Sequence, residues 1–520
     1  MKSLHSIIIF IALVATKIAY GGVAEGHKAF KEGDYVTAFI EFKSAAELGD
    51  VAGQTNLATL YRDGRGTSKN APLAVKWFSM AATQGYAPAQ ANLGSMYVDG
   101  LGVPQNYQEG LKWLRLAADQ GYPTAQRNLG VMYANGIGVP INDQEAVKWF
   151  RLAADQGYAF AQGNLGEMYK TGRGVALDTK IAAYWHRLAA DQGYASSQNE
   201  LAFLLTYGSL FDLKQDLLEA KKLYQLSAEQ GNTLGQFSLG LAYQYGWGTS
   251  INLDEAIKWF RKSAEAGYAD SQMKLGEFYL KGENVVQSEA EAIKWYQLSA
   301  NQNNVVSQFA LGDIFRAKVG SYYLTEDGTI RNGTSQSSVI LAKNLKDAVF
   351  WFQKAAKTGY PDAQVELGIL YMKGWGSNPE EKRDYSQAAD LYKKAAIQGS
   401  NSGQFLLARM YEAGQGVPKN IREAIKWHRL AADKNARGSL SSLGAFYADG
   451  QGVPKVPIAA YALYNVSAAS GDKAAEESRD LLAKSMSMLD IQTAQNLSSE
   501  MVQPNNILKS LDAYVAKVKK

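Results

Sequence analysis

Side chains that could carry out catalysis are sparse in this chain of 520 residues. The absence of cysteine excludes thiolate metal sites, a cysteine nucleophile and disulfides. Only four histidines occur, and His186 and His428 follow a tryptophan at the same place in distant segments, so spacing does not pair them. Zinc requires three or four convergent ligands, and no zinc-protease, serine-hydrolase or phosphate-loop motif is present. We therefore predict that the chain is not an enzyme and has no cofactor or metal.

Two series of amide side chains recur, mostly 36 residues apart, and could bind a partner. Each amide offers both a hydrogen-bond donor and an acceptor, so a row of them could hold an extended peptide by its backbone. The alternative is that the amides hydrogen-bond within or between repeats. The first series is Asn56, Asn92, Asn128 and Asn164. The second series is Gln54, Gln90, Gln126, Gln162, Gln198, Gln236, Gln272, Gln308, Gln364 and Gln404.

The tryptophans fall into two groups. Eight share one position on an apolar stripe, which predicts core packing and not a stacking platform for bases or sugars. Trp247 and Trp375 instead lie inside Gly-x-Gly turns, where they are candidates for exposed binding anchors. Tyr322 and Tyr323 are further candidates, because they lie in an inserted segment.

An internal repeat explains these spacings. The segment Leu116 to Tyr122 recurs unchanged at residues 152–158 and 188–194, and its glycine marks successive units. Twelve such anchors enclose eleven units, so the array extends through nearly the whole chain. The anchors are Gly49, Gly85, Gly121, Gly157, Gly193, Gly231, Gly267, Asn303, Gly359, Gly399, Asn435 and Gly471.

Each unit is predicted to form two helices joined by a short turn. The first helix carries Ala-x-x-x-Leu-Gly-x-x-Tyr, as at residues 89–97, and the second carries Ala-x-x-Trp-x-x-x-Ala-Ala, as at 74–82. These offsets place the apolar residues on one helical stripe. A Gly-x-Gly-Val-Pro turn such as residues 100–104 ends the first helix, and Asn-x-x-Glu, as at Asn142 and Glu145, caps the second.

A glycine follows the leucine of the first helix in most units. Glycine inside a helix costs about 1 kcal/mol relative to alanine, so its recurrence needs a reason. We expect a neighbouring helix to pack against the backbone there, with a large tryptophan or tyrosine of the second helix filling the nearby space.

The combined motifs resemble the Sel1-like repeat family, which is related to tetratricopeptide repeats. The resemblance covers roughly residues 52–471. It implies an all-α chain, an α/α solenoid superhelix of about eleven repeats with capping helices at both ends. It also implies an adaptor that serves protein assembly, with roles that include quality control, signalling and bacterial host interaction.

Two units depart from the pattern. In the unit from Gly193 to Gly231 the Gly-x-Gly turn is replaced by residues 207–211. In a later unit about twenty extra residues, placed near 317–340, are expected to extend the inter-helix turn. The β-branched and aromatic stretch Ser321 to Ile330 surrounds Asp-Gly, which predicts a hairpin. The insertion either lies at a binding surface or is a tolerated loop.

The N-terminus has the pattern of a secretory signal. Lys2 precedes the apolar run Ile7 to Ala15, and small residues near 19–24 suggest the cleavage site. An uncleaved membrane anchor is the alternative, although the run is short for a span. We therefore expect a periplasmic or secreted protein with no integral span after cleavage. The predicted segments are 1–24 (signal peptide), 25–49 (tetratricopeptide-like hairpin), 50–471 (repeats) and 472–520 (capping helices and a basic tail).

The partner is predicted to be a protein or a peptide. With 54 Lys+Arg against 50 Asp+Glu, the formal charge of +4 is too small to favour nucleic acid. The favoured function is an exported, non-enzymatic scaffold that binds this partner on its concave surface, in envelope assembly or host interaction. The alternative is an accessory factor for envelope remodelling that binds a glycan or a peptidoglycan-linked partner through exposed aromatic rings.

Overall fold

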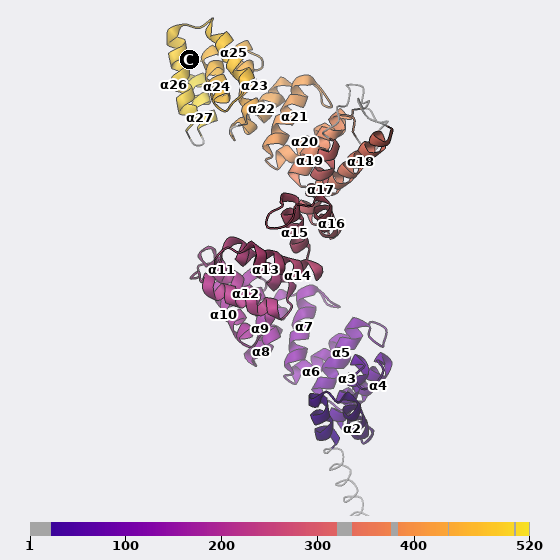
Figure 1. The fold of residues 1–520 in the computed structure, drawn as a ribbon. Helices are drawn as coiled ribbons and strands as arrows, with labels where there is room; N and C mark the ends of the chain where they lie inside the picture. Colours follow the sequence, from indigo (N-terminus) through magenta and orange to yellow (C-terminus); the bar gives the residue numbers. More distant parts are fainter. Residues whose placement is uncertain (1–21, 320–334, 376–382, 435, 504–505, 519–520) are drawn as a thin grey trace, which may run out of the picture. The chain divides into compact units, whose positions relative to one another are not determined.

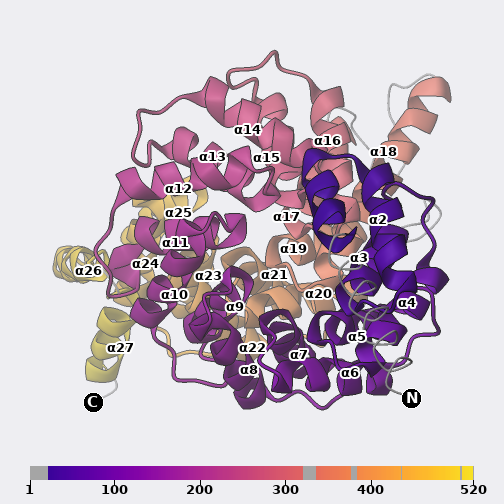
Figure 2. The same cartoon turned by 90° about the horizontal axis from the view of Figure 1, so that it is seen from below.

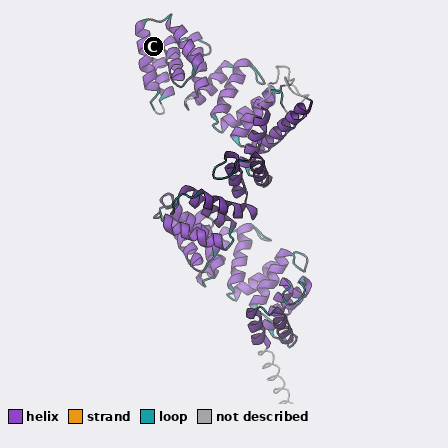
Figure 3. Cartoon of the chain, in the orientation of Figure 1, coloured by secondary structure: helices purple, strands orange, loops and turns teal. Residues whose placement is uncertain are grey.

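The computed structural model describes residues 22–319, 335–375, 383–434, 436–503 and 506–518. Within these ranges every regular element is a helix and no strand occurs (Figure 3). The prediction of an all-α repeat array is therefore confirmed. The chain divides into two compact units, Met1–Ala266 and Gly267–Lys520 (Figure 1).

The first compact unit begins with a helical segment at residues 22–32, which packs with α2 through Ala29, Ala38 and Phe42. Its other helices are α2 (Tyr35–Glu47), α3 (Val51–Asp63), α4 (Ala71–Thr83), α5 (Ala87–Asp99), α6 (Tyr107–Asp119), α7 (Pro123–Asn135), α8 (Asp143–Asp155), α9 (Ala159–Thr171), α10 (Thr179–Asp191), α11 (Ala195–Thr206), the 3₁₀ turn η1 (Gly208–Leu210), α12 (Leu217–Glu229), α13 (Thr233–Tyr245) and α14 (Leu253–Glu265). Odd-numbered helices from α3 onward are the first helices of repeats. Among them, α5 contacts α7 and α7 contacts α9. Figure 2 shows α5 and α7 towards the inner side of the curve that this unit follows, with α6 and α8 outside them.

The second compact unit continues the same alternation and ends in additional helices. Its helices are α15 (Ala269–Lys281), α16 (Glu289–Asn301), α17 (Val305–Val319), α18 (Ser335–Lys357), α19 (Pro361–Met372), α20 (Tyr385–Ile397), α21 (Asn401–Ala413), α22 (Ile421–Ala432), α23 (Arg437–Asp449), α24 (Pro457–Ala469), α25 (Lys473–Ala483), α26 (Met488–Met501) and α27 (Ile507–Val518). The final helix buries Ile507, Leu511 and Val515, and Arg429 on α22 pairs with Asp512 at 2.6 Å.

The ends of the helices follow the predicted signals. In the α7–α8 repeat, Gly136 ends the first helix with a φ of 69°, and the Asn142 side chain accepts a hydrogen bond from the Glu145 backbone N–H. The Asn142 backbone N–H, however, donates to the Tyr133 carbonyl at 2.9 Å, while Glu145 pairs with Lys148 at 3.6 Å. The cap therefore ties the second helix to the end of the first.

The glycine inside the first helix provides space for a ring, as expected, but the ring comes from a different residue. A Cβ on Gly130 would lie 2.5 Å from the ring of Phe150, which follows Trp149 in the repeat. The same position supplies Tyr296 against Gly276 and His186 against Gly166. The expectation of a tryptophan is therefore wrong, whereas the expectation of a tyrosine is confirmed in the units that contain Tyr296, Tyr392 and Tyr464. The shared tryptophan position is nevertheless buried in six units, at Trp149, Trp185, Trp259, Trp295, Trp351 and Trp427.

The glutamine series forms hydrogen bonds within each unit and to the preceding unit. Gln126 is 4% exposed, donates to the Ala118 carbonyl at 3.3 Å, and accepts from Gln156 at 2.8 Å. We call this arrangement the glutamine relay. Its donor–acceptor pairs are Gln84–Gln54, Gln120–Gln90, Gln156–Gln126, Gln192–Gln162, Gln230–Gln198, Gln302–Gln272 and Gln398–Gln364. For these glutamines the internal alternative is correct, because the amides are engaged in packing.

The inserted segment is more helical than expected. Helix α17 continues to Val319, and α18 has 23 residues where a regular second helix such as α8 has 13. Residues 317–319 and 335–340 therefore belong to helices and not to a turn, because the insertion lengthens both helices that flank it. The predicted hairpin at residues 321–330 lies outside the described residues, as does the apolar part of the predicted signal.

Candidate binding surface on the first helices

The four asparagines lie on α3, α5, α7 and α9, each two residues after a buried glutamine. All four are half-buried, in contrast to the glutamines. Each contacts a neighbouring element: Asn56 lies 3.2 Å from the His27 ring, and Asn92 accepts from Arg62 at 2.7 Å. Further along, Asn128 donates to Ser95 at 3.2 Å and Asn164 accepts from Arg127 at 3.0 Å. These asparagines thus belong to a polar row that links successive first helices.

Some hydrogen-bonding capacity in this row is unused. Asn92 uses both of its side-chain polar atoms, because its Nδ2 also donates to the Pro88 carbonyl at 2.8 Å. Among the described residues, the Nδ2 of Asn164 and the Oδ1 of Asn56 make no hydrogen bond. A peptide backbone laid along the row could use these atoms.

A pocket of about 250 Å³ opens between α5, α6 and α7 beside Asn128. The buried side chains of Leu114 and Met132 line it. Val98, Val131 and Ile137 extend the apolar wall, and Ser95, Asp99, Arg127 and Asn128 supply the polar groups. The volume lies below the usual range for drug-sized ligands and cofactors, so it suits a single side chain.

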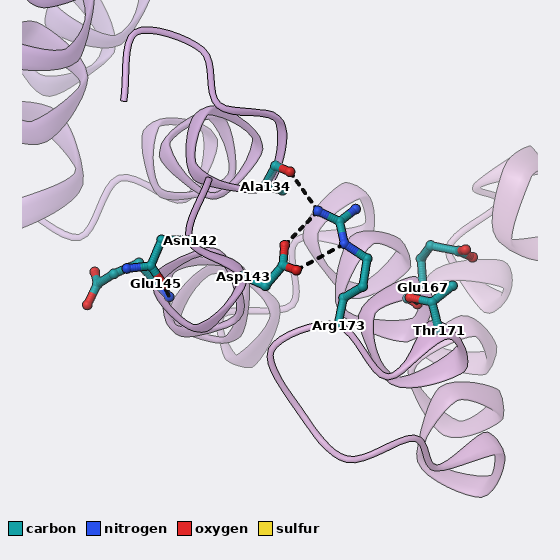
Figure 4. Close-up of polar contacts among 7 residues, drawn as sticks. All are labelled: Ala134, Asn142, Asp143, Glu145, Glu167, Thr171 and Arg173. Carbon is teal, nitrogen blue, oxygen red and sulfur yellow. Dashed lines mark hydrogen bonds and ion pairs between the residues drawn. The ribbon is translucent and has the colours of Figure 1, made fainter. Parts of the chain in front are cut away.

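The next gap along the array is crossed by an arginine. Arg173 occupies the turn position that Ile137 holds one repeat earlier. Its Nη2 donates to the Ala134 carbonyl at 2.6 Å, and its guanidinium also pairs with Asp143 at 2.6 Å (Figure 4). This turn position therefore reaches the preceding unit in one repeat, whereas in the repeat before it the apolar side chain of Ile137 lines the pocket.

Trp247 holds the same turn position and lies in a cluster of aromatic rings. Its ring stacks on that of Tyr245, with 5.5 Å between the ring centres, and meets the Tyr207 ring edge-on, with 5.8 Å between the ring centres. The Phe203 ring contacts both Tyr207 and Phe211. Three of these five residues come from α11 and the segment that replaces the regular turn. Trp247 itself is half-buried, and Tyr245 is 53% exposed.

The remaining sequence candidates are not brought together with this cluster. Trp375 is half-buried against the core of the second compact unit, and the Lys373 ammonium lies 4.7 Å from its ring centre. Tyr322 and Tyr323 lie outside the described residues. The pocket residues Ser95, Asp99 and Arg127 were not predicted from the sequence. Arg127 could have been noticed, because uncharged residues occupy its repeat position in the other units.

One buried group superficially resembles a catalytic triad. His428 lies 2.5 Å from Glu412 through Nε2 and 3.0 Å from Ser439 through Nδ1. Both His428 and Ser439 are 0% exposed, so a substrate could not reach the serine hydroxyl. Nor do the described residues contain three or more His, Asp or Glu gathered as a metal site. The arrangement satisfies buried polar atoms where α21, α22 and α23 pack together.

In the described ranges, no helix combines the length and the apolar character that crossing a bilayer requires.

Stacked helical hairpins joined by the glutamine relay define an α/α solenoid of short repeats. The Sel1 repeat family model matches residues 51–86, 87–122, 123–158, 159–194, 195–232, 233–268, 269–304, 307–360, 361–400, 401–435 and 439–472. The chain belongs to the Sel1 repeat family, as the sequence motifs suggested. Repeats of this family generally mediate protein binding, and its members are typically non-catalytic scaffolds.

Similar proteins come from several kingdoms. A crystal structure of a protective antigen from uropathogenic Escherichia coli strains superposes with a TM-score of 0.64 at 31% identity, covering 93% of this chain and 97% of that one. The ERAD-associated E3 ubiquitin-protein ligase component HRD3B of Arabidopsis thaliana is 36% identical over 84 residues, 16% of this chain. An exopolysaccharide production negative regulator of Rhizobium meliloti is 36% identical over 89 residues, 17% of this chain. This chain spans only 12% and 33% of the lengths of those two curated relatives.

Proposed function

We propose that this protein is an exported scaffold that holds a protein or peptide partner along the first helices of its N-terminal repeats. The observation that carries the proposal is the polar row of Asn56, Asn92, Asn128 and Asn164, which is half-exposed and has unused hydrogen-bonding atoms. An extended backbone alternates donors and acceptors, as such a row requires. Membership of a protein-binding repeat family supports the same conclusion.

Export is the second part of the proposal. It rests on the predicted signal at residues 1–24 and on the similarity to a protein described as a protective antigen. We expect fractionation to recover the protein from the periplasm or the medium, with an N-terminus 19 to 24 residues into the chain. Recovery of the full chain in the cytoplasm alone would exclude export.

The binding surface is tested by changing Asn92, Asn128 and Asn164 together to alanine. We expect the variant to keep its helical circular dichroism but to lose partner capture from a cell-envelope extract, because backbone contacts along the row are removed. The matched control changes Lys76, Lys112 and Lys148 to alanine on second helices, and it should capture the partner normally. Equal capture by both variants would exclude the polar row.

A second candidate is supported by the aromatic cluster around Trp247. Partly exposed aromatic rings can stack on the apolar face of a sugar, which favours a glycan or peptidoglycan-linked partner in envelope remodelling. Trp247→Ala should then reduce binding to soluble peptidoglycan fragments at least tenfold, measured by titration calorimetry, while the asparagine variant binds them normally. Competition by peptides but not by glycans would favour the first function.

A further inference from the structure

The pocket between α5, α6 and α7 presents two opposite charges that are not paired with each other. The Arg127 side chain bonds to the amide oxygens of Asn164 at 3.0 Å and Asn128 at 3.4 Å. Within the described residues Arg127 makes no ion pair, and neither does Asp99 at the end of α5. The Asp63 carboxylate, which holds the corresponding position one repeat earlier, pairs instead with Arg62 at 2.8 Å.

A peptide group complements this arrangement. Its carbonyl accepts a hydrogen bond and its N–H donates one, so Arg127 and Asp99 could hold the two ends of one peptide unit. The buried surfaces of Leu114 and Met132 offer the adjoining side chain an apolar environment. Because an aliphatic side chain gains free energy on leaving water, an apolar residue should be preferred there.

The turn residue beside the pocket differs from that of the next repeat. Arg173 crosses to Ala134 and Asp143 of the preceding unit, whereas Ile137 packs against the core that contains Leu114 and Met132. Ile137 makes no such polar link, and Arg127 is the charged exception at its repeat position. The other units form the repeat fold without the combination of an arginine at the Arg127 position and an isoleucine at the Ile137 position.

We infer that this pocket is a subsite for one aliphatic side chain of an extended peptide, whose backbone is held by Arg127 and Asp99. The inference rests on the proposed peptide-binding function and names the residue class that the surface selects. The polar row then continues the contact along the peptide on α7 and α9.

The test uses N-acetyl-leucine-N′-methylamide as the probe and ¹³C-methyl NMR of Met132 and Ile137 in the full mature chain. We expect saturable shifts of both methyl signals at millimolar probe, and at least tenfold weaker binding of N-acetylglycine-N′-methylamide, which lacks the side chain. Arg127→Met should weaken binding of the leucine probe about tenfold, because it removes the charged donor. Arg409→Met, on the first helix α21 of the second compact unit, is the matched control and should leave binding unchanged.

Filling the pocket provides a second variant. Val131→Trp should abolish the methyl shifts while circular dichroism remains that of the wild type. The subsite is excluded if the probe produces no saturable shift, if the leucine and glycine probes bind equally, or if Val131→Trp has no effect. Loss of capture in the asparagine variant without any probe binding would exclude the subsite and keep the scaffold function. Probe binding in a chain that captures no protein or peptide would exclude the scaffold function instead.

Discussion

His186 is a basic side chain enclosed by a helical hairpin. It is 2% exposed, its Nδ1 lies 3.2 Å from the Ser197 hydroxyl, and its Nε2 has no hydrogen-bond partner in the described residues. Burial, reinforced by the positive charge of Lys170, lowers the pKa of His186 from 6.5 to about 3. The imidazole is therefore neutral in the folded protein at neutral pH.

This shift predicts a loss of stability in acid. Between pH 6.5 and about 3 the unfolded chain binds a proton that the folded chain does not, so the contribution of His186 is complete above pH 6.5 and decreases as the pH falls. His186→Phe places a phenylalanine at this position, which Phe150 holds in the preceding repeat. The substitution should remove this loss of stability in acid. We expect the variant to lose about 2 kcal/mol less stability than the wild type between pH 7 and pH 4.5, measured by urea unfolding.

The matched control is His27→Phe, because His27 is exposed. This variant should follow the wild-type pH dependence. If the His186→Phe and wild-type curves remain parallel, the buried imidazole does not control acid stability.

At the scale of elements, the glutamine relay is incomplete where its donor is replaced. Ala266, Thr358 and Lys434 occupy the donor position in three units. The corresponding acceptor oxygens are buried and receive no hydrogen bond in the described residues. They belong to Gln236, Gln308 and Gln404. Ala266 has φ −75° and ψ 2°, close to the −81° and 4° of Gln156, so its backbone already suits a glutamine.

Ala266→Gln should therefore stabilise the protein. The new amide would donate to the Gln236 oxygen and satisfy a buried acceptor, which is worth about 1 kcal/mol. Differential scanning calorimetry would detect this as a higher melting temperature. Ala266→Glu has nearly the same shape but no N–H to donate at pH 7, and it should give no increase. Equal stabilisation by both substitutions would contradict the hydrogen-bond explanation.

The elements could be predicted well because their signals recur in phase. The asparagine caps and left-handed glycines such as Gly136 depend on local backbone geometry, which the sequence displays directly. The pocket could not be predicted, because it arises from α5, α6 and α7 together and from the absence of a crossing side chain at Ile137. The identity of the ring against Gly130 was missed for a similar reason, since adjacent helical positions differ in direction by about 100°.

Across the whole molecule, stability should be local. Each hairpin of a repeat array packs mainly on its sequence neighbours, so a defect should weaken adjacent units more than distant ones. Substitution of Gly174 should be strongly destabilising. The φ of Gly174 is 69°, and an added Cβ would lie 2.3 Å from the Asp143 carbonyl oxygen of the preceding repeat.

We predict that Gly174→Ala accelerates amide hydrogen exchange in α8–α10 and leaves α20–α24 unchanged, as measured by mass spectrometry. Gly172→Ala is the control, because Gly172 has a similar φ of 71° but its added Cβ would come no closer than 3.2 Å, to the Leu177 Cβ. This control should show a smaller effect in the same helices. Uniform acceleration over both compact units would indicate a single cooperative structure.

The direction of the glutamine relay has a consequence for synthesis on the ribosome. Each acceptor precedes its donor by 30 residues in a regular unit, as Gln126 precedes Gln156. A first helix that has just emerged therefore holds an oxygen that only the end of the second helix of its own hairpin can satisfy. Because chains emerge N-terminus first, each hairpin should close only when its second helix has emerged completely. A pause between two repeats would then leave every emerged hairpin with its glutamine pair formed, whereas a pause inside a second helix would leave the newest pair open.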